Sequence, residues 1–143
     1  MQKWLVLFSF LGIAEVVRCG SYYIPDAVKD WFEAVEFCHE LEMRLAVVDS
    51  AEKQHAIVEA IRSSDVFNPN RMDLWIGAND LDQEGRFVWQ ATGEGLGYTN
   101  WKPTMPDDHL LNEDCVHLHY TPFNDFQWND YICYKKLYFV CEQ

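Results

Sequence analysis

The five cysteines of this 143-residue chain constrain its fold more than any other feature of the sequence. Four of them, Cys38, Cys115, Cys133 and Cys141, can close two disulfide bridges, and their spacing leaves three possible connectivities. None belongs to a Cys-x-x-Cys pair, which argues against zinc-ribbon and thioredoxin-like folds. Two bridges in one small domain indicate an oxidising compartment, and Cys19 remains as the odd cysteine.

The first residues have the layout of a secretory signal. Lys3 supplies the positive charge, and the apolar run behind it is too short to span a bilayer. The small residue Ala14 predicts a signal peptide over residues 1–14, and a signal over residues 1–19 is the alternative. A buried N-terminal strand or helix is the competing structural interpretation. We therefore expect a secreted, extracellular protein.

The two cleavage positions give Cys19 different fates. After a cut behind Ala14, Cys19 stays in the mature chain and can link two chains into a disulfide-bonded homodimer or heterodimer. After a cut behind Cys19 it is lost. The sequence leaves both outcomes open.

The composition predicts a packed domain and excludes two classes of partner. Hydrophobic residues make up 49% of the chain and aromatic residues 15%, which is enough to bury a core. The formal net charge of −12 argues against nucleic acid and anionic membranes as partners. No second apolar stretch is long enough for membrane insertion.

Periodicity in the first half predicts a strand, a helix, a strand and a helix. A short strand is expected at 22–24, and Asp30 opens a helix with Glu33 in capping-box register. Residues 45–48 form the next strand candidate, and Ser50 caps a second helix that runs to about Arg62.

The second half is expected to hold strands around a long loop. Strand candidates lie at 74–76, 87–89, 115–120 and 137–141. Residues 90–114 show no periodicity, and a loop of this length inside a compact domain is typical of a functional segment. Two helices followed by strands predict an α+β fold.

An ordered set of motifs resembles the C-type lectin family, most closely its short secreted single-domain members from invertebrates. Each motif alone is weak, but together with four placed cysteines they cover residues 21–143, the expected carbohydrate-recognition domain. The motifs are Trp75-Ile76-Gly77, Gly85-Arg86-Phe87-Val88-Trp89, Trp101-Lys102-Pro103, Met105-Pro106-Asp107, Glu113-Asp114-Cys115-Val116, Trp128-Asn129-Asp130 and Phe139-Val140-Cys141-Glu142.

The resemblance implies a fold and a disulfide pairing. The family has two helices, small antiparallel sheets and a long calcium-binding loop. Its pattern pairs Cys38 with Cys141 and Cys115 with Cys133. It also implies a cis peptide bond between Met105 and Pro106.

The resemblance also implies two calcium sites. The carbohydrate-binding site maps onto Met105, Asp107, Glu113, Asn129 and Asp130, of which all but Met105 can bind the ion. A thioether is too soft for calcium, so we expect a weakened site. An auxiliary calcium site, which would hold the long loop in shape, maps onto Asp80, Glu84, Asp108 and Asp114.

These expectations describe a calcium-dependent lectin, whose partners are glycans or glycoconjugates recognised in defence. In the family, Glu-Pro-Asn goes with mannose-type sugars and Gln-Pro-Asp with galactose-type sugars, so Asp107 favours galactose while Met105 matches neither triplet. The alternative is a protein-binding module with the same fold that binds no sugar. Met105 favours that alternative.

Two further readings carry less support from the sequence. No nucleophile elbow, phosphate loop or His-Glu-x-x-His motif occurs, so we expect no enzyme. His117 and His119 lie on one face of a predicted strand, where a His-x-His pair can bind zinc, but the sequence offers no evident third ligand. We expect them on the outer face of the strand, opposite Val116 and Leu118.

Overall fold

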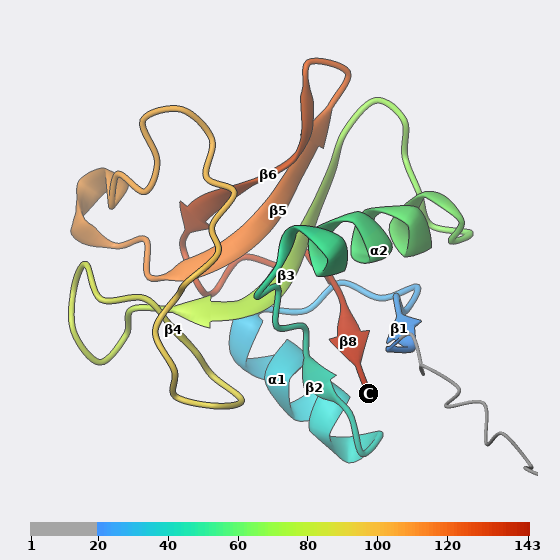
Figure 1. The fold of residues 1–143 in the computed structure, drawn as a ribbon, viewed down its shortest axis with the longest axis horizontal. Helices are drawn as coiled ribbons and strands as arrows, with labels where there is room; N and C mark the ends of the chain where they lie inside the picture. Colours follow the sequence, from blue (N-terminus) through green and yellow to red (C-terminus); the bar gives the residue numbers. More distant parts are fainter. Residues whose placement is uncertain (1–19) are drawn as a thin grey trace, which may run out of the picture.

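The computed structural model describes residues 20–143, so the predicted signal peptide and Cys19 lie outside the described residues. The predicted helices and strands occur in the expected order along the chain, with one further strand, β6, that the sequence did not predict (Figure 1). Their bounds are β1 Tyr22–Tyr23, α1 Trp31–Glu40, β2 Arg44–Leu45, α2 Ala51–Arg62, β3 Met72–Asn79, β4 Val88–Trp89, the short 3-10 helix η1 His109–Leu111, β5 Cys115–Thr121, β6 Asn124–Tyr131, β7 Tyr138–Phe139 and β8 Cys141–Glu142.

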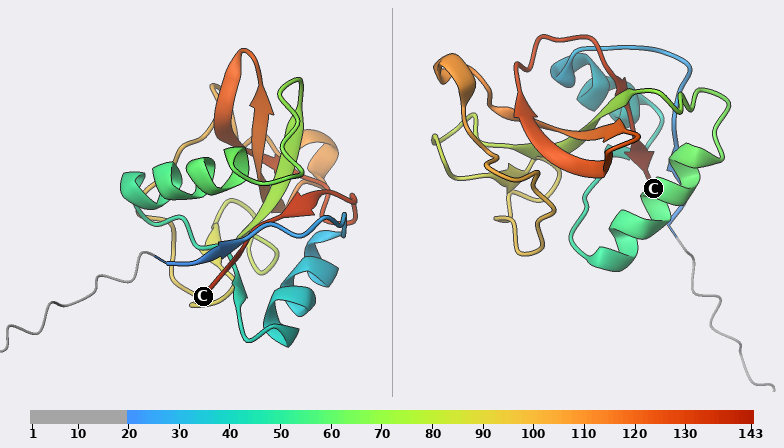
Figure 2. Two further views of the ribbon diagram at one scale, coloured as in Figure 1. Left: turned by 90° about the vertical axis from the view of Figure 1, so that its right-hand side faces the viewer. Right: turned by 90° about the horizontal axis from the view of Figure 1, so that it is seen from above.

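The strands form two sheets. A small antiparallel sheet has the order β1-β8-β2 and brings the two ends of the domain together. A larger sheet has the order β4-β3-β5-β6, with β7 pairing in parallel with β3. Two helices with mainly antiparallel sheets confirm the predicted α+β fold, and the two helices lie on different sides of the central strands (Figure 2).

Both helices begin at the predicted caps. The Asp30 carboxylate accepts a hydrogen bond from the Glu33 amide (2.9 Å), and the Glu33 carboxylate accepts one from the Asp30 amide (3.0 Å). This reciprocal pair satisfies two amides that have no partner inside the helix. At α2 the Ser50 hydroxyl accepts from the amide of Lys53 (3.1 Å). Neither helix has the length and apolar character that crossing a bilayer requires, among the residues described.

Two apolar cores lie on opposite faces of the central strands. The larger core joins α2 to the sheet through residues such as Ile57, Leu74 and Trp128. The smaller core lies under α1 and includes Trp31 and Trp75, which are both buried. Strand alternation places Leu74 in one core and Trp75 in the other.

The disulfides join segments that are distant in sequence. Cys38 of α1 is bonded to Cys141 of β8, with a Cα–Cα distance of 5.4 Å. Cys115, at the start of β5, is bonded to Cys133 beyond β6, with a Cα–Cα distance of 5.2 Å. Both bridges lie in the smaller core and hold the ends of the domain and of the long loop in place.

Three predicted strands differ from the observed ones by more than one residue. The segment 45–48 is strand only at Leu45, because Ala46 donates to Val140, between β7 and β8, and accepts from Gly77 of β3. The expected strand 137–141 is likewise divided into β7 and β8, which pair with different sheets. Strand 74–76 extends to all of β3.

The long loop lies at one end of the molecule, away from β1 and the C-terminus (Figure 1). Aromatic residues anchor it to the larger core: the rings of Trp101 and Trp128 have centroids 5.7 Å apart. The Lys102 amide donates to the Trp128 carbonyl (2.9 Å), and the Trp128 amide donates to the Asn100 carbonyl (2.7 Å). The loop is therefore fixed at its middle to β6, beside the residues of the predicted site.

Candidate functional site

Three predicted ligands from the long loop and β6 lie close together. Carboxylate oxygens of Asp107, Glu113 and Asp130 lie within 4.8 Å of one another. Asp107 and Glu113 come from the loop, and Asp130 comes from the paired strand β6. We call these three residues the loop–strand cluster.

Asp130 fastens the loop to the strand. Its side chain is only 1% exposed, and its carboxylate accepts hydrogen bonds from the backbone amides of Asp107 (3.1 and 3.2 Å to the two oxygens) and Asp108 (2.7 Å). Hydrogen bonds from backbone amides to a charged carboxylate are among the stronger ones in proteins. The β6 strand thus sets the position of the predicted ligand Asp107.

Glu113 is held in a position that disfavours its charge. The residue is 7% exposed, and its carboxylate accepts from the His109 amide (3.3 Å). Burial, followed by the negative charge of Asp130, raises the pKa of Glu113 to about 7. A cation placed among these carboxylates would offset the repulsion and favour the charged form.

The remaining predicted members of this site lie beside the cluster. Asn129 precedes Asp130 on β6, and its amide nitrogen donates to the Asp130 carbonyl (2.8 Å) and lies 3.1 Å from His117 Nε2. Met105 is partly exposed and precedes Pro106 through a cis peptide bond. Its sulfur is a soft donor, unlike the oxygens of its neighbours.

A second group of carboxylates stands between β3 and the start of β5. Oxygens of Asp80, Glu84 and Asp114 lie within 4.8 Å of one another. Asp80 is 1% exposed, and one of its oxygens accepts from the Gly85 amide (2.8 Å). The other oxygen, Oδ1, is buried and has no hydrogen-bond partner. We call this group the β3–β5 cluster.

The β3–β5 cluster also disfavours its own charges. Burial, and then the charges of Glu84, Asp114 and Asp108, raises the pKa of Asp80 to about 6. Desolvation and the neighbouring Asp108 and Asp114 also raise the pKa of Glu84. A buried, unpaired carboxylate oxygen is costly unless a cation or a hydrogen-bond donor meets it.

Asp108 was expected in the second group but lies between the two. It is not among the three residues whose oxygens converge, and its Oδ1 instead accepts from the Glu113 amide (3.0 Å). Its backbone amide donates to Asp130, so Asp108 contacts the loop–strand cluster directly. Its negative charge still raises the pKa of Asp80, which shows that the two clusters influence each other.

The loop around these residues has an unusual backbone. Thr104, Asp108, Leu110 and Leu111 all have positive φ, a conformation that side chains other than glycine seldom adopt. Such residues persist only where the surroundings determine them, and they concentrate at binding sites. Leu110 and Leu111 are 82% and 88% exposed, so this part of the loop presents apolar side chains to solvent.

The donor set suits a hard divalent cation. Both clusters offer carboxylate oxygens, and the loop–strand cluster has the Asn129 side chain next to it. Calcium takes six to eight oxygen ligands, mostly from carboxylates and carbonyls. The buried Asp80 Oδ1, with no partner of its own, is an oxygen that such an ion would satisfy.

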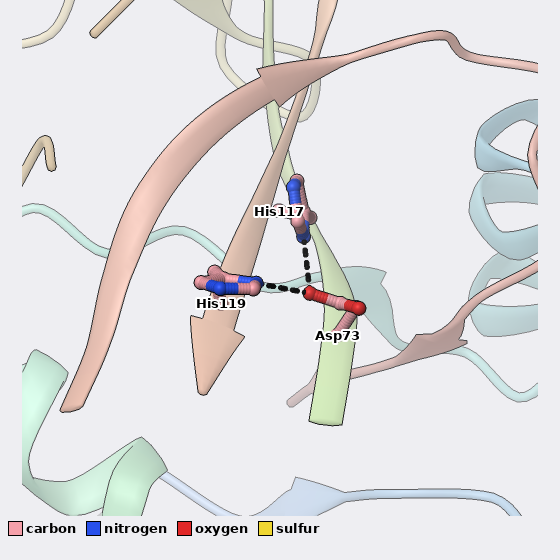
Figure 3. Close-up of side chains that lie close together, drawn as sticks. All are labelled: Asp73, His117 and His119. Atoms are coloured by element: carbon pink, nitrogen blue, oxygen red, sulfur yellow. Dashed lines mark hydrogen bonds and ion pairs between the residues drawn. The ribbon is translucent and has the colours of Figure 1, made fainter. Parts of the chain in front are cut away.

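A third cluster, formed by Asp73, His117 and His119, was not predicted from the sequence (Figure 3). The two histidines do lie opposite Val116 and Leu118, but the expected outer face is wrong for His117, which is 4% exposed against Trp75 and Tyr131. Asp73 is the third partner that the sequence did not reveal. Only the antiparallel register of β3 and β5 places it opposite His119.

Comparison with known proteins gives consistent matches over most of the chain. A model of the "Lectin C-type domain" matches residues 27–143. "Salivary C-type lectin 1" of Aedes albopictus is 44% identical over 126 residues, which cover 87% of this chain and 82% of that protein. The mouse scavenger receptor C-type lectin carbohydrate-recognition domain has a TM-score of 0.75 at 30% identity, covering 87% of this chain and 89% of that one. The cow CD23 domain, solved in the presence of a GlcNAc2Man3 oligosaccharide, has a TM-score of 0.72 at 32% identity and 87% coverage of both chains.

Proposed function

The chain belongs to the C-type lectin family, whose domains are non-enzymatic binding modules, and we propose that it is a secreted lectin that binds glycans through calcium. The proposed domain spans residues 21–143, behind a signal peptide of residues 1–14. Secretion is consistent with two disulfide bridges in the domain. Glycan recognition in defence is the process that we propose on the analogy of the family.

The observation that carries this proposal is the pair of carboxylate clusters. Asp80, Glu113 and Asp130 are all buried, and each stands beside further carboxylates. Proteins seldom bury several like charges together unless a cation or other partner compensates them. The raised pKa values of Asp80 and Glu113 reflect burial first and the repulsion of neighbouring carboxylates second.

The two clusters are proposed to act differently. Asp107, Glu113, Asn129 and Asp130 form the sugar site, where a calcium ion would complete its shell with two sugar hydroxyls. Asp80, Glu84 and Asp114, with Asp108 between the clusters, form the auxiliary site that keeps the loop in its binding conformation. Because Asp108 contacts Glu113 and influences Asp80, ordering one site supports the other.

The sugar preference is proposed from the triplet around Pro106. Asp107 corresponds to the galactose-type triplet, so we propose a preference for galactose-type glycans. Met105 supplies neither an oxygen ligand nor a hydrogen bond, and one lost polar contact costs about 1–3 kcal/mol. Each site is therefore expected to bind sugar weakly.

A glycan array probed with calcium and again with chelator tests the proposal. Binding of galactose-terminated glycans should require calcium and should be lost in Glu113→Gln. Glu59→Gln is the matched control, because Glu59 is an exposed residue of α2 remote from the loop. Calcium-independent binding that survives Glu113→Gln would refute the assignment.

The second candidate function is a protein-binding module without sugar affinity. It is favoured by Met105 in the triplet and by the exposed Leu110 and Leu111 at the tip of the same loop. Exposed apolar side chains that lie together on a surface can mark a site of protein contact. In that case the wild-type domain would bind no glycan on the array, although calcium would still stabilise it.

A further inference from the structure

We propose that Asp73, His117 and His119 form a binding site for a divalent transition-metal ion, with zinc as its most suitable occupant. None of these three residues belongs to the carboxylate clusters proposed for calcium. Its three ligand atoms, one carboxylate oxygen and two imidazole nitrogens, lie within 4.8 Å of one another.

Strand pairing explains why these three side chains converge. β3 and β5 are antiparallel, with Asp73 opposite His119 and Trp75 opposite His117. His117 and His119 are two residues apart on β5, so they project from the same face of the sheet. Directly opposite and diagonal neighbours on one face are within reach of each other, and the three side chains point toward a common centre (Figure 3).

The two distances from the histidine nitrogens to Asp73 Oδ1 are close to those of a tetrahedral site. His117 Nδ1 lies 3.3 Å from Asp73 Oδ1, and His119 Nδ1 lies 2.6 Å from the same oxygen. Zinc ligands at 2.0–2.2 Å in a tetrahedron are separated by roughly 3.3 Å from one another. The His117 distance already fits, and the His119 side chain, which is 16% exposed, must withdraw by less than about 1 Å to fit as well.

The second observation is a buried nitrogen that points into this site and lies 3.3 Å from Asp73 Oδ1 without forming a hydrogen bond to it. His117 is 4% exposed, and its Nδ1 forms no hydrogen bond, although it faces the Asp73 carboxylate. A buried polar atom without a hydrogen bond destabilises the folded state. A metal ion bound to Nδ1 would satisfy it without moving the buried ring.

Neighbouring residues already provide the outer contacts that orient metal ligands. Arg71 Nε donates to Asp73 Oδ2 (3.0 Å), which leaves Oδ1 for the ion. His117 Nε2 lies 3.1 Å from the Asn129 side-chain amide. Outer contacts of this kind fix the ring and strengthen binding.

The donor set selects the metal. Two imidazoles and one carboxylate suit zinc and related ions such as cobalt, whereas calcium requires six or more oxygen ligands. Three protein ligands leave the fourth tetrahedral position for water. The ion would join β3 to β5 across the register that places Asp73 opposite His119.

Calorimetric titration of the secreted protein with zinc chloride, with and without excess calcium, tests the proposal. Calcium is included because the carboxylate clusters can also take up zinc. One equivalent of zinc should bind in excess calcium, and the ring signals of His117 and His119 should shift in NMR spectra while those of His39, His55 and His109 do not. Zinc binding that calcium abolishes, or shifts at the other histidines alone, would overturn the site.

Substitution of the proposed ligands tests where the zinc ion binds. Loss of an outer contact weakens metal sites about 10–100-fold, so loss of a ligand in Asp73→Asn or His119→Gln should weaken zinc binding by at least about 100-fold. His55→Gln is the matched control, because His55 is exposed on α2. Unchanged melting of each variant in calcium confirms folding. Zinc affinity equal to wild type in both ligand variants would refute the proposal.

Discussion

Calcium binding to this domain should release protons. The raised pKa values of Glu113 and Asp80 should make the number of released protons depend on pH. Glu113 has a pKa of about 7 and Asp80 a pKa of about 6, in each case because of burial first and neighbouring carboxylates second. Both groups therefore hold protons near neutral pH before an ion binds. Calcium requires the charged carboxylates, so binding expels these protons.

The expected number follows from the two titrations. At pH 6.5 Glu113 is about three-quarters protonated and Asp80 about one-quarter protonated, so saturating calcium should release about one proton per chain. At pH 8 both groups are almost fully ionised, and the release should fall to about 0.1 proton. Calcium affinity should accordingly rise with pH across this interval.

Calorimetry in two buffers of different ionisation enthalpy measures the released protons directly. Glu113→Gln should reduce the release at pH 6.5 to about one-quarter of a proton, because Asp80 remains in the auxiliary site. Glu59→Gln should behave as wild type. A release that is zero at pH 6.5, or equal at pH 6.5 and pH 8, would refute the assignment of these two carboxylates to calcium.

Three further outcomes are expected from the same structure. In chelator, the domain should lose stability as pH rises from about 4 to 8, on the order of 2–3 kcal/mol for each of Asp80 and Glu113. Their contribution to stability is complete below the unfolded pKa and is lost as pH rises through the raised, folded pKa. Urea unfolding measured against pH checks this, and a gain in stability over that range would contradict it. Asp80→Asn should raise the melting temperature in chelator and reduce the further rise that calcium produces. For wild type at a hundred times the Kd, calcium should add about 2.7 kcal/mol to the free energy of unfolding. Met105→Ala should reduce the calcium effect less, and equal effects of the two substitutions would reject the auxiliary site. If cleavage follows Ala14, wild type should run as a disulfide-linked dimer in non-reducing electrophoresis and Cys19→Ser as a monomer; a wild-type monomer that begins beyond Cys19 would exclude the dimer.

Local signals in the sequence predicted the helices well. The caps at Asp30 and Ser50 depend on residues within three positions, and both are present in the structure. The strand β6 was not predicted, although Phe126, Trp128 and Asp130 alternate on its buried face. Its polar residues and the positive φ of Phe126, next to a register shift against β5, obscured that alternation.

The candidate sites show the same division between local and distant information. The resemblance to the C-type lectins predicted that Asp107, Glu113 and Asp130 belong to one site, and the fold brings their oxygens together. The position of Asp108 depends on backbone hydrogen bonds within the loop, which no residue pattern specifies. The proximity of Asp73 to His117 and His119 could not be predicted from the sequence, because it depends only on the register between β3 and β5.

The most direct test of the central claim is calorimetric titration of a galactose-terminated oligosaccharide into wild type and Met105→Gln, with saturating calcium and with chelator. Wild type should bind weakly and only with calcium. Met105→Gln restores the galactose-type triplet and should tighten binding by about 1–3 kcal/mol. Binding by Met105→Gln alone would favour the protein-binding function for the natural domain. If neither protein binds sugar while calcium is saturating, the sugar site at Asp107, Glu113, Asn129 and Asp130 is contradicted.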